Sequence, residues 1–219
     1  VAQRLSAGHP GGAGDAGAGF TTRRAGCFWG ASQIREQHVK LLGLYRHAKS
    51  GWSDPRARDF DRPLNERGRL GAAAMGKHIQ AYGARWERIV ASPAVRCAET
   101  IELGYQATAQ TYSVNWDRRI YLASSATLLD LLCELEGNPA SLLMVGHNPG
   151  LEDLIFDLVP DDGTSPLRDI VEDKFPTAAF AVLELDVASW AQAQPGCARL
   201  IHLTRPRDLD PALGPEPVD

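Results

Sequence analysis

Two histidines and two arginines stand just after short apolar segments, where their side chains can act together on one anion. Arg46 and His47 follow the first such segment, Arg96 comes soon after the second, and His147 follows the third. An arginine guanidinium is a permanently charged planar fork that matches two phosphoryl oxygens, and histidine serves as a nucleophile or proton carrier near neutral pH. No carboxylate cluster with metal-ligand spacing lies beside them in the sequence. The set therefore predicts metal-free phosphoryl transfer through a phosphorylated histidine.

Three strands must end at one edge of a sheet for these side chains to meet. The hydrophobic pattern predicts alternating strands and helices, which is typical of an α/β protein with a largely parallel central sheet. Ligands of such sheets bind beyond the carboxyl ends of the strands, so we expect a three-layer α/β/α sandwich with both arginines and both histidines at one crevice. The expected strands are residues 39–45, 89–91, 112–116, 141–145, 178–185 and 198–203, and the expected helices are residues 66–82, 95–103, 126–136 and 150–158.

The first expected helix carries the clearest local signals. Asn65 is its predicted N-cap and Gly83 its predicted stop. Residues 71–78 nearly match a nucleotide-binding loop, but His78 replaces the magnesium-binding hydroxyl residue, and a helix is the wrong context for such a loop. We therefore assign structural positions to His78, on a helix surface, and to His202, in a strand. The apolar face of the helix is expected to contain Leu70, Met75, Ile79 and Tyr82.

Composition narrows the class of protein and of partner. The chain has 219 residues, of which 44% are hydrophobic, and 23 Lys and Arg against 27 Asp and Glu give a formal net charge of −4. This balance argues against nucleic acid or an anionic membrane as a partner, so an anionic ligand needs a local cluster of arginines. No apolar run approaches the roughly 20 residues of a membrane span. The four cysteines are scattered, which favours a reduced, cytoplasmic location.

The chain divides by composition into three parts. Residues 1–38 are rich in Gly and Ala and are expected to be flexible, and they fit a linker, an organelle transit peptide or an over-long gene prediction. Residues 39–205 hold the predicted domain. Residues 206–219 are expected to form a loose Pro-rich tail.

Several motifs resemble those of a known family. Arg46-His47-Ala48 resembles the Arg-His-Gly signature of the histidine phosphatase superfamily, residues 92–100 resemble its second-arginine motif, and residues 146–150 resemble its second-histidine motif. Two longer stretches, residues 46–50 and residues 61–68, are most similar to the SixA-type phosphohistidine phosphatase branch. The resemblance implies a phosphoglycerate-mutase-like fold, and a reaction in which His47 attacks phosphorus and is transiently phosphorylated.

The same resemblance implies roles for particular residues. Arg46, Arg96 and His147 would hold the non-bridging oxygens, whose charge must be stabilised in the transition state. No metal or other cofactor is implied. The residues expected to bind substrate in addition are Arg62, Ser53 and Asn148.

The sequence departs from the superfamily pattern at two places. Ala48 stands where much of the superfamily has Gly, and Asn148 stands where phytase-like members have an acid. No glutamate near residues 121–125 matches the acid of mutase-like members. A weakly placed acid suits an easily broken P–N bond, which favours phosphohistidine over an alkyl phosphate ester. The remaining candidates for a proton donor are Asp54, Asp59, Asp61 and Glu152.

These observations predict a metal-independent phosphatase that acts on phosphohistidine in a signalling phosphoprotein of the histidine-phosphotransfer type. Two alternatives stay open: a general phosphomonoesterase acting on a small phosphorylated metabolite, and a non-catalytic phosphate-binding protein. The sequence has no obvious large cap insertion, so the mouth of the site is expected to be open enough to admit a protein surface.

Overall fold

The computed structural model describes residues 39–52, 56–111 and 113–214. The N-terminal segment 1–38 and Ser53 lie outside these residues. The described chain contains a six-stranded sheet with the order β3-β2-β4-β1-β5-β6. Its strands are β1 (Val39–Arg46), β2 (Arg88–Ala91), β3 (Asn115–Trp116), β4 (Ser141–Gly146), β5 (Phe180–Asp186) and β6 (Ala198–Thr204).

The sheet is parallel where the predicted site lies and antiparallel beyond it. The strands β3, β2, β4 and β1 pair in parallel, whereas β5 runs antiparallel to both β1 and β6. Arg46 pairs with Gly146 in the register of β1 and β4, so the carboxyl ends of these two strands lie side by side. The predicted α/β sandwich with a largely parallel sheet is confirmed.

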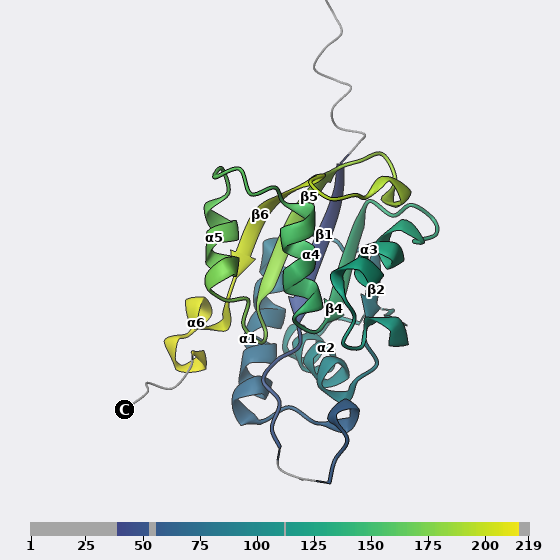
Figure 1. Cartoon of the computed structure of the whole chain (residues 1–219). Helices are drawn as coiled ribbons and strands as arrows, with labels where there is room; N and C mark the ends of the chain where they lie inside the picture. The colour runs from purple at the N-terminus through teal and green to yellow at the C-terminus, as the bar shows by residue number, and fades with distance from the viewer. Residues whose placement is uncertain (1–38, 53–55, 112, 215–219) are drawn as a thin grey trace, which may run out of the picture. The chain divides into compact units, whose positions relative to one another are not determined.

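Helices cover both faces of the sheet, as Figure 1 shows. None of the helices in the described part of the chain is both long and apolar enough to span a bilayer. One face carries α1 (Glu66–Tyr82) and α2 (Val95–Thr108), and the other carries α3 (Ser125–Cys133), α4 (Gly150–Leu158) and α5 (Pro166–Asp173).

Alternation along the central strands builds a separate core on each face. All residues of β4 are buried: Leu142 and Met144 belong to the core under α3, α4 and α5, while Leu143 and Val145 belong to the core under α1 and α2. Successive side chains of a strand point to opposite faces, and a central parallel strand is covered on both. The central position of β4, with helices on both faces, therefore explains the continuous apolar run before His147.

The boundaries of α1 agree with the sequence prediction, but one residue of its apolar face does not. The Asn65 side chain accepts a hydrogen bond from the Gly68 amide at 2.8 Å, and Gly83 follows the helix with a φ of 81°. Met75 is buried, whereas Leu70 is 56% exposed, so the placement of Leu70 on the buried face was wrong. A step of five positions from Leu70 to Met75 corresponds to about 1.4 helical turns, which moves Leu70 off the face of Met75.

Two segments form helical structure that the sequence pattern did not predict. The helix α5 was not expected, because its short and highly charged sequence buries only Val171. Beyond Arg205, the chain forms the short helix α6 (Pro206–Leu209) and the 3-10 turn η5 (Pro211–Leu213).

Candidate active site

The ends of β1, β2 and β4 bring the predicted site residues together. The His47 amide donates to the Gly146 carbonyl at 3.0 Å, and the Ser92 amide donates to a carbonyl of β4, also at 3.0 Å. The ring centroids of His47 and His147 are 5.0 Å apart, and Arg96 Nε lies 3.3 Å from His47 Nε2. Side chains that are far apart in the sequence therefore form one buried polar cluster.

The imidazole of His47 is held in one tautomer. Its Nδ1 lies 2.8 Å from the carbonyl oxygen of Ala48, and because a carbonyl oxygen only accepts, Nδ1 carries the hydrogen. The lone pair is therefore on Nε2, the atom that accepts from Arg96. Burial is the main reason that the pKa of His47 is lowered to about 3, although the Ala48 bond opposes this effect. At neutral pH the ring is uncharged, as a nucleophile must be.

His147 is fixed by side chains on both sides of its ring. Its Nε2 lies 2.8 Å from Ser92 Oγ and 3.6 Å from Cys97 Sγ, and the Tyr121 ring meets it at right angles with 5.4 Å between centroids. Burial lowers the pKa of His147 to about 3, and the charge of Arg96 adds to this effect. Nδ1 of His147 is buried without a hydrogen-bond partner among the described residues, so it is the ring nitrogen left for an oxyanion.

Arg96 is a buried guanidinium with a fixed orientation. Its side chain is only 3% exposed, and its Nη1 donates to the Asp59 carbonyl at 2.5 Å while Nη2 donates to the Asp59 carboxylate at 2.9 Å. Together with Nε on His47, these bonds use three of the five N–H donors of a guanidinium. The remaining two N–H groups can bind the oxygens of a ligand.

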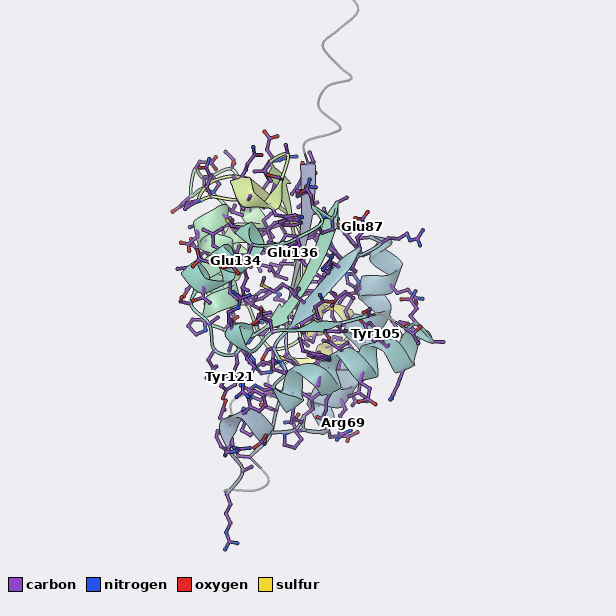
Figure 2. The ribbon with its side chains drawn as sticks, turned by 90° about the vertical axis from the view of Figure 1, so that its right-hand side faces the viewer. Arg69, Glu87, Tyr105, Tyr121, Glu134 and Glu136 are labelled. Carbon is purple, nitrogen blue, oxygen red and sulfur yellow. The ribbon has the colours of Figure 1, made fainter. Side chains whose placement is uncertain are left out.

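Asp59 lies in the 3-10 turn η2 (Asp59–Asp61) and connects three side chains at the site. It accepts from Tyr121 Oη at 2.7 Å and forms ion pairs with Arg96 and, at 3.1 Å, with Arg62. Figure 2 shows Tyr121 at the end of the sheet, close to this turn. Burial alone raises the pKa of Asp59, but the Tyr121 bond and the charge of Arg96 outweigh it and lower the pKa. Asp59 is therefore an ionised carboxylate that orients Arg96.

Arg46 supplies the second guanidinium of the cluster. Its Nη1 donates to the Phe175 carbonyl at 2.6 Å, and its Nε is buried without a partner in the described ranges. Burial lowers the pKa of Arg46, and the nearby carboxylate of Glu152 opposes that shift. The Ala178 amide donates to the carbonyls of Arg46 and His47 at 3.1 and 3.0 Å, so the segment after α5 runs alongside both residues.

This arrangement can bind a tetrahedral oxyanion. Two guanidinium groups and one imidazole nitrogen supply N–H donors around the Nε2 lone pair of His47. Within residues 39–52, 56–111 and 113–214, no three His, Cys, Asp or Glu side chains are grouped so that they could hold a metal ion.

Comparison with known proteins places the chain in a family. Residues 42–119 match the family description "Histidine phosphatase superfamily (branch 1)". The uncharacterized protein Rv1276c of Mycobacterium tuberculosis is 34% identical over 164 residues, which cover 74% of this chain and 99% of that protein. The solved structure of SixA from Agrobacterium tumefaciens, a proposed phosphohistidine phosphatase, is 30% identical with a TM-score of 0.63, covering 76% of this chain and 97% of that one. The chain belongs to the histidine phosphatase superfamily.

A second SixA structure supports the same relationship. SixA from Nakamurella multipartitia is 27% identical with a TM-score of 0.65, and the match covers 77% of this histidine phosphatase and 96% of that chain. The family and these neighbours support a phosphatase activity. The resemblance to the superfamily and to its SixA-type members, predicted from the motifs, is confirmed.

The residues expected to add substrate contacts have partners within the protein where they are described. Nδ2 of Asn148 donates to Glu152 Oε2 at 2.8 Å. The guanidinium carbon of Arg62 lies 4.0 Å from the centroid of the Trp52 ring. Both side chains hold neighbouring loops of the histidine phosphatase, and their contact with substrate, like that of Ser53, stays a prediction.

The candidate proton donors that the structure describes all accept hydrogen bonds from other groups of the protein. Asp61 accepts from Arg58 Nε at 2.8 Å, and Glu152 accepts from a side-chain amide at 2.8 Å and from a backbone amide at 3.2 Å. Asp59 accepts from a phenol and a guanidinium, and Asp54 lies outside the described residues. In these contacts the carboxyl oxygens of Asp59, Asp61 and Glu152 accept hydrogen bonds and donate none.

Thr100 is part of the site, although the sequence analysis gave it no role. Its Oγ1 accepts from the Ala48 amide at 2.9 Å and donates to the Arg96 carbonyl at 2.6 Å, and the side chain is wholly buried. It therefore links the residue after His47 to the helix that carries Arg96. The available signal was its position, since residues four apart lie on the same face of a helix.

Proposed function

We propose that this histidine phosphatase hydrolyses phosphohistidine in a signalling phosphoprotein of the cytoplasm, through a phosphorylated His47 and without a metal ion. The observation that carries the proposal is the state of His47, a neutral imidazole whose Nε2 lone pair lies against Arg96 and beside His147. A nucleophile needs an unprotonated lone pair, and the phosphoryl group that it attacks needs positive charge around its oxygens.

In the first proposed step, the Nε2 lone pair of His47 forms a bond to phosphorus while the bond from phosphorus to the substrate nitrogen breaks. Arg46, the two remaining N–H groups of Arg96 and Nδ1 of His147 hold the non-bridging oxygens. In the second step, water attacks phosphorus and the Nε2–P bond breaks, with its electron pair returning to Nε2. Inorganic phosphate leaves with the oxygen of that water.

The state of Asp59 favours a substrate whose leaving group needs no proton from the enzyme. An imidazole leaves as a neutral ring when its other nitrogen already carries a proton, whereas an alkyl ester leaves as an alkoxide unless an acid protonates it. Asp59, the carboxylate closest to Arg96, has a lowered pKa and accepts two side-chain hydrogen bonds. This supports phosphohistidine over a sugar phosphate as the substrate.

A direct comparison of substrates tests the proposal. The full chain is given a phosphorylated histidine-phosphotransfer domain and, separately, a set of sugar phosphates, and kcat/KM is measured for each. We expect the phosphorylated domain to be preferred by a wide margin. A preference for sugar phosphates would instead make the protein a general phosphomonoesterase, and phosphate binding without any turnover would make it a binding protein.

A further inference from the structure

A basic cavity adjoins the candidate active site. It has a volume of about 340 Å³, and five cationic residues line it: Arg46, Lys49, Arg67, Lys174 and Arg207. We call it the cationic cleft. No Asp or Glu is among the described residues that line it, although the chain as a whole carries a formal net charge of −4. The cleft therefore concentrates positive charge beside the site where Arg46 is proposed to hold the phosphoryl group.

Backbone contacts hold the elements that carry these cations. A Cβ at Gly68 would stand 2.0 Å from the Lys49 carbonyl oxygen, so the first turn of α1 packs directly against the loop after β1. Arg67 Nη1 donates to the Gly214 carbonyl at 2.9 Å, which connects that turn to the segment after α6. The Ala178 amide joins the segment after α5 to the end of β1. The cationic cleft is thus formed by the fold before any ligand arrives.

Most of this positive charge is not neutralised within the protein. In the described part of the chain, neither Lys49 nor Lys174 pairs with a carboxylate. Arg207 has a distant partner, Asp173, at 3.7 Å, and the Asp173 side chain is 74% exposed. Like charges that share one cavity repel each other, and an anion that binds among them removes that repulsion.

We propose that the cationic cleft binds acidic side chains of the phosphoprotein substrate, next to the phosphohistidine that reaches His47. This inference rests on the proposed function. Lys49, Lys174 and Arg207 are exposed, so the cleft is a depression in the surface that a protein segment can cover. Arg46 is common to the cleft and the active site, so one substrate can place its phosphoryl group and its carboxylates on neighbouring cations.

Removal of the two unpaired lysines tests the proposal. The Lys49→Ala/Lys174→Ala variant is compared with the Lys77→Ala/Arg85→Ala variant, which loses the same charge outside the cleft. Three substrates are used: free phosphohistidine, a phosphohistidine peptide with Asp and Glu flanks, and the same peptide with Asn and Gln flanks. For the acidic peptide we expect the cleft variant to raise KM about fivefold to tenfold at low salt with kcat unchanged, because exposed ion pairs are individually weak.

The outcomes separate the cleft from the proposed function. If the cleft binds acidic flanks, KM for free phosphohistidine and for the neutral peptide changes less than about twofold, and the control variant behaves as wild type. Equal KM values for acidic and neutral peptides in wild type, or an equal rise in the control variant, would overturn the cleft proposal alone. Failure of the wild-type protein to turn over free phosphohistidine and both peptides would overturn the proposed function itself.

Discussion

Replacement of Thr100 by Val removes the hydroxyl that joins the nucleophile loop to α2 and leaves the shape of the side chain almost unchanged. The Ala48 amide is buried and loses the acceptor that lies 2.9 Å away. A buried donor without an acceptor costs about 1–3 kcal/mol. In a domain of this size, a loss of about 2 kcal/mol lowers Tm by roughly 4–8 °C. Because Ala48 directly follows His47, we also expect kcat/KM to fall on the order of tenfold to a hundredfold.

Thr100→Ser is the matched control for this change. Serine keeps the hydroxyl and loses one methyl group, which costs on the order of 1 kcal/mol and leaves the bond to Ala48 in place. Thermal unfolding followed by circular dichroism gives Tm, and turnover of a phosphohistidine substrate gives kcat/KM. If the valine variant melts no lower than the serine variant and is equally active, the Thr100 hydroxyl does not position His47, and the reasoning is refuted.

Three further tests have expected outcomes. Burial lowers the pKa of His47 and His147 to about 3, so below about pH 6.5 only the unfolded chain binds these protons, and the free energy of unfolding should fall. Urea unfolding at several pH values measures this dependence. A His47→Gln variant whose free energy of unfolding falls with pH as steeply as that of wild type would contradict it. A Cβ at Gly150 would stand 2.1 Å from the Ala123 carbonyl oxygen, so Gly150→Ala should lower the free energy of unfolding by about 1–3 kcal/mol. A Gly150→Ala variant that melts at the same temperature as wild type would count against this. EDTA should leave turnover unchanged while phosphate or vanadate inhibits, and metal-restored activity after EDTA would refute the metal-free step.

The sequence predicts best those elements that carry their own boundary signals. The ends of α1 follow from Asn65, whose side chain caps the first turn, and from Gly83, which adopts a positive φ. The range of α4, Gly150–Leu158, also agrees with the prediction. These signals act over a few neighbouring residues, so they can be recognised without knowledge of the fold.

Elements defined by distant partners were harder to predict. An apolar pattern identifies β5 and β6 as strands, but their antiparallel direction is set by pairing with β1 across the sheet. The helix α5 is only eight residues long and buries only Val171, so its helical pattern extends over little more than two turns. Leu70 shows the opposite error, since an apolar residue near a helical face is not necessarily on it.

The convergence of the main site residues could be anticipated, but their supporting contacts could not. Arg46 is the last residue of β1, and His47 and His147 directly follow the parallel strands β1 and β4, whose ends lie side by side. The carbonyl that orients Arg46 belongs to Phe175, 129 residues away, and every residue has such a carbonyl. The contact of Asp59 with the site depends on the path of a loop, which residue types alone do not specify.

The proposed mechanism depends most directly on a phosphoryl group bound to His47. The full chain is mixed briefly with a ³²P-labelled phosphohistidine protein, quenched in alkali and mapped by peptide mass spectrometry, alongside His47→Ala. We expect an acid-labile, alkali-stable phosphate on the peptide that contains His47, and neither label nor turnover in the His47→Ala variant. A label on a different residue, or full turnover by His47→Ala, would contradict it.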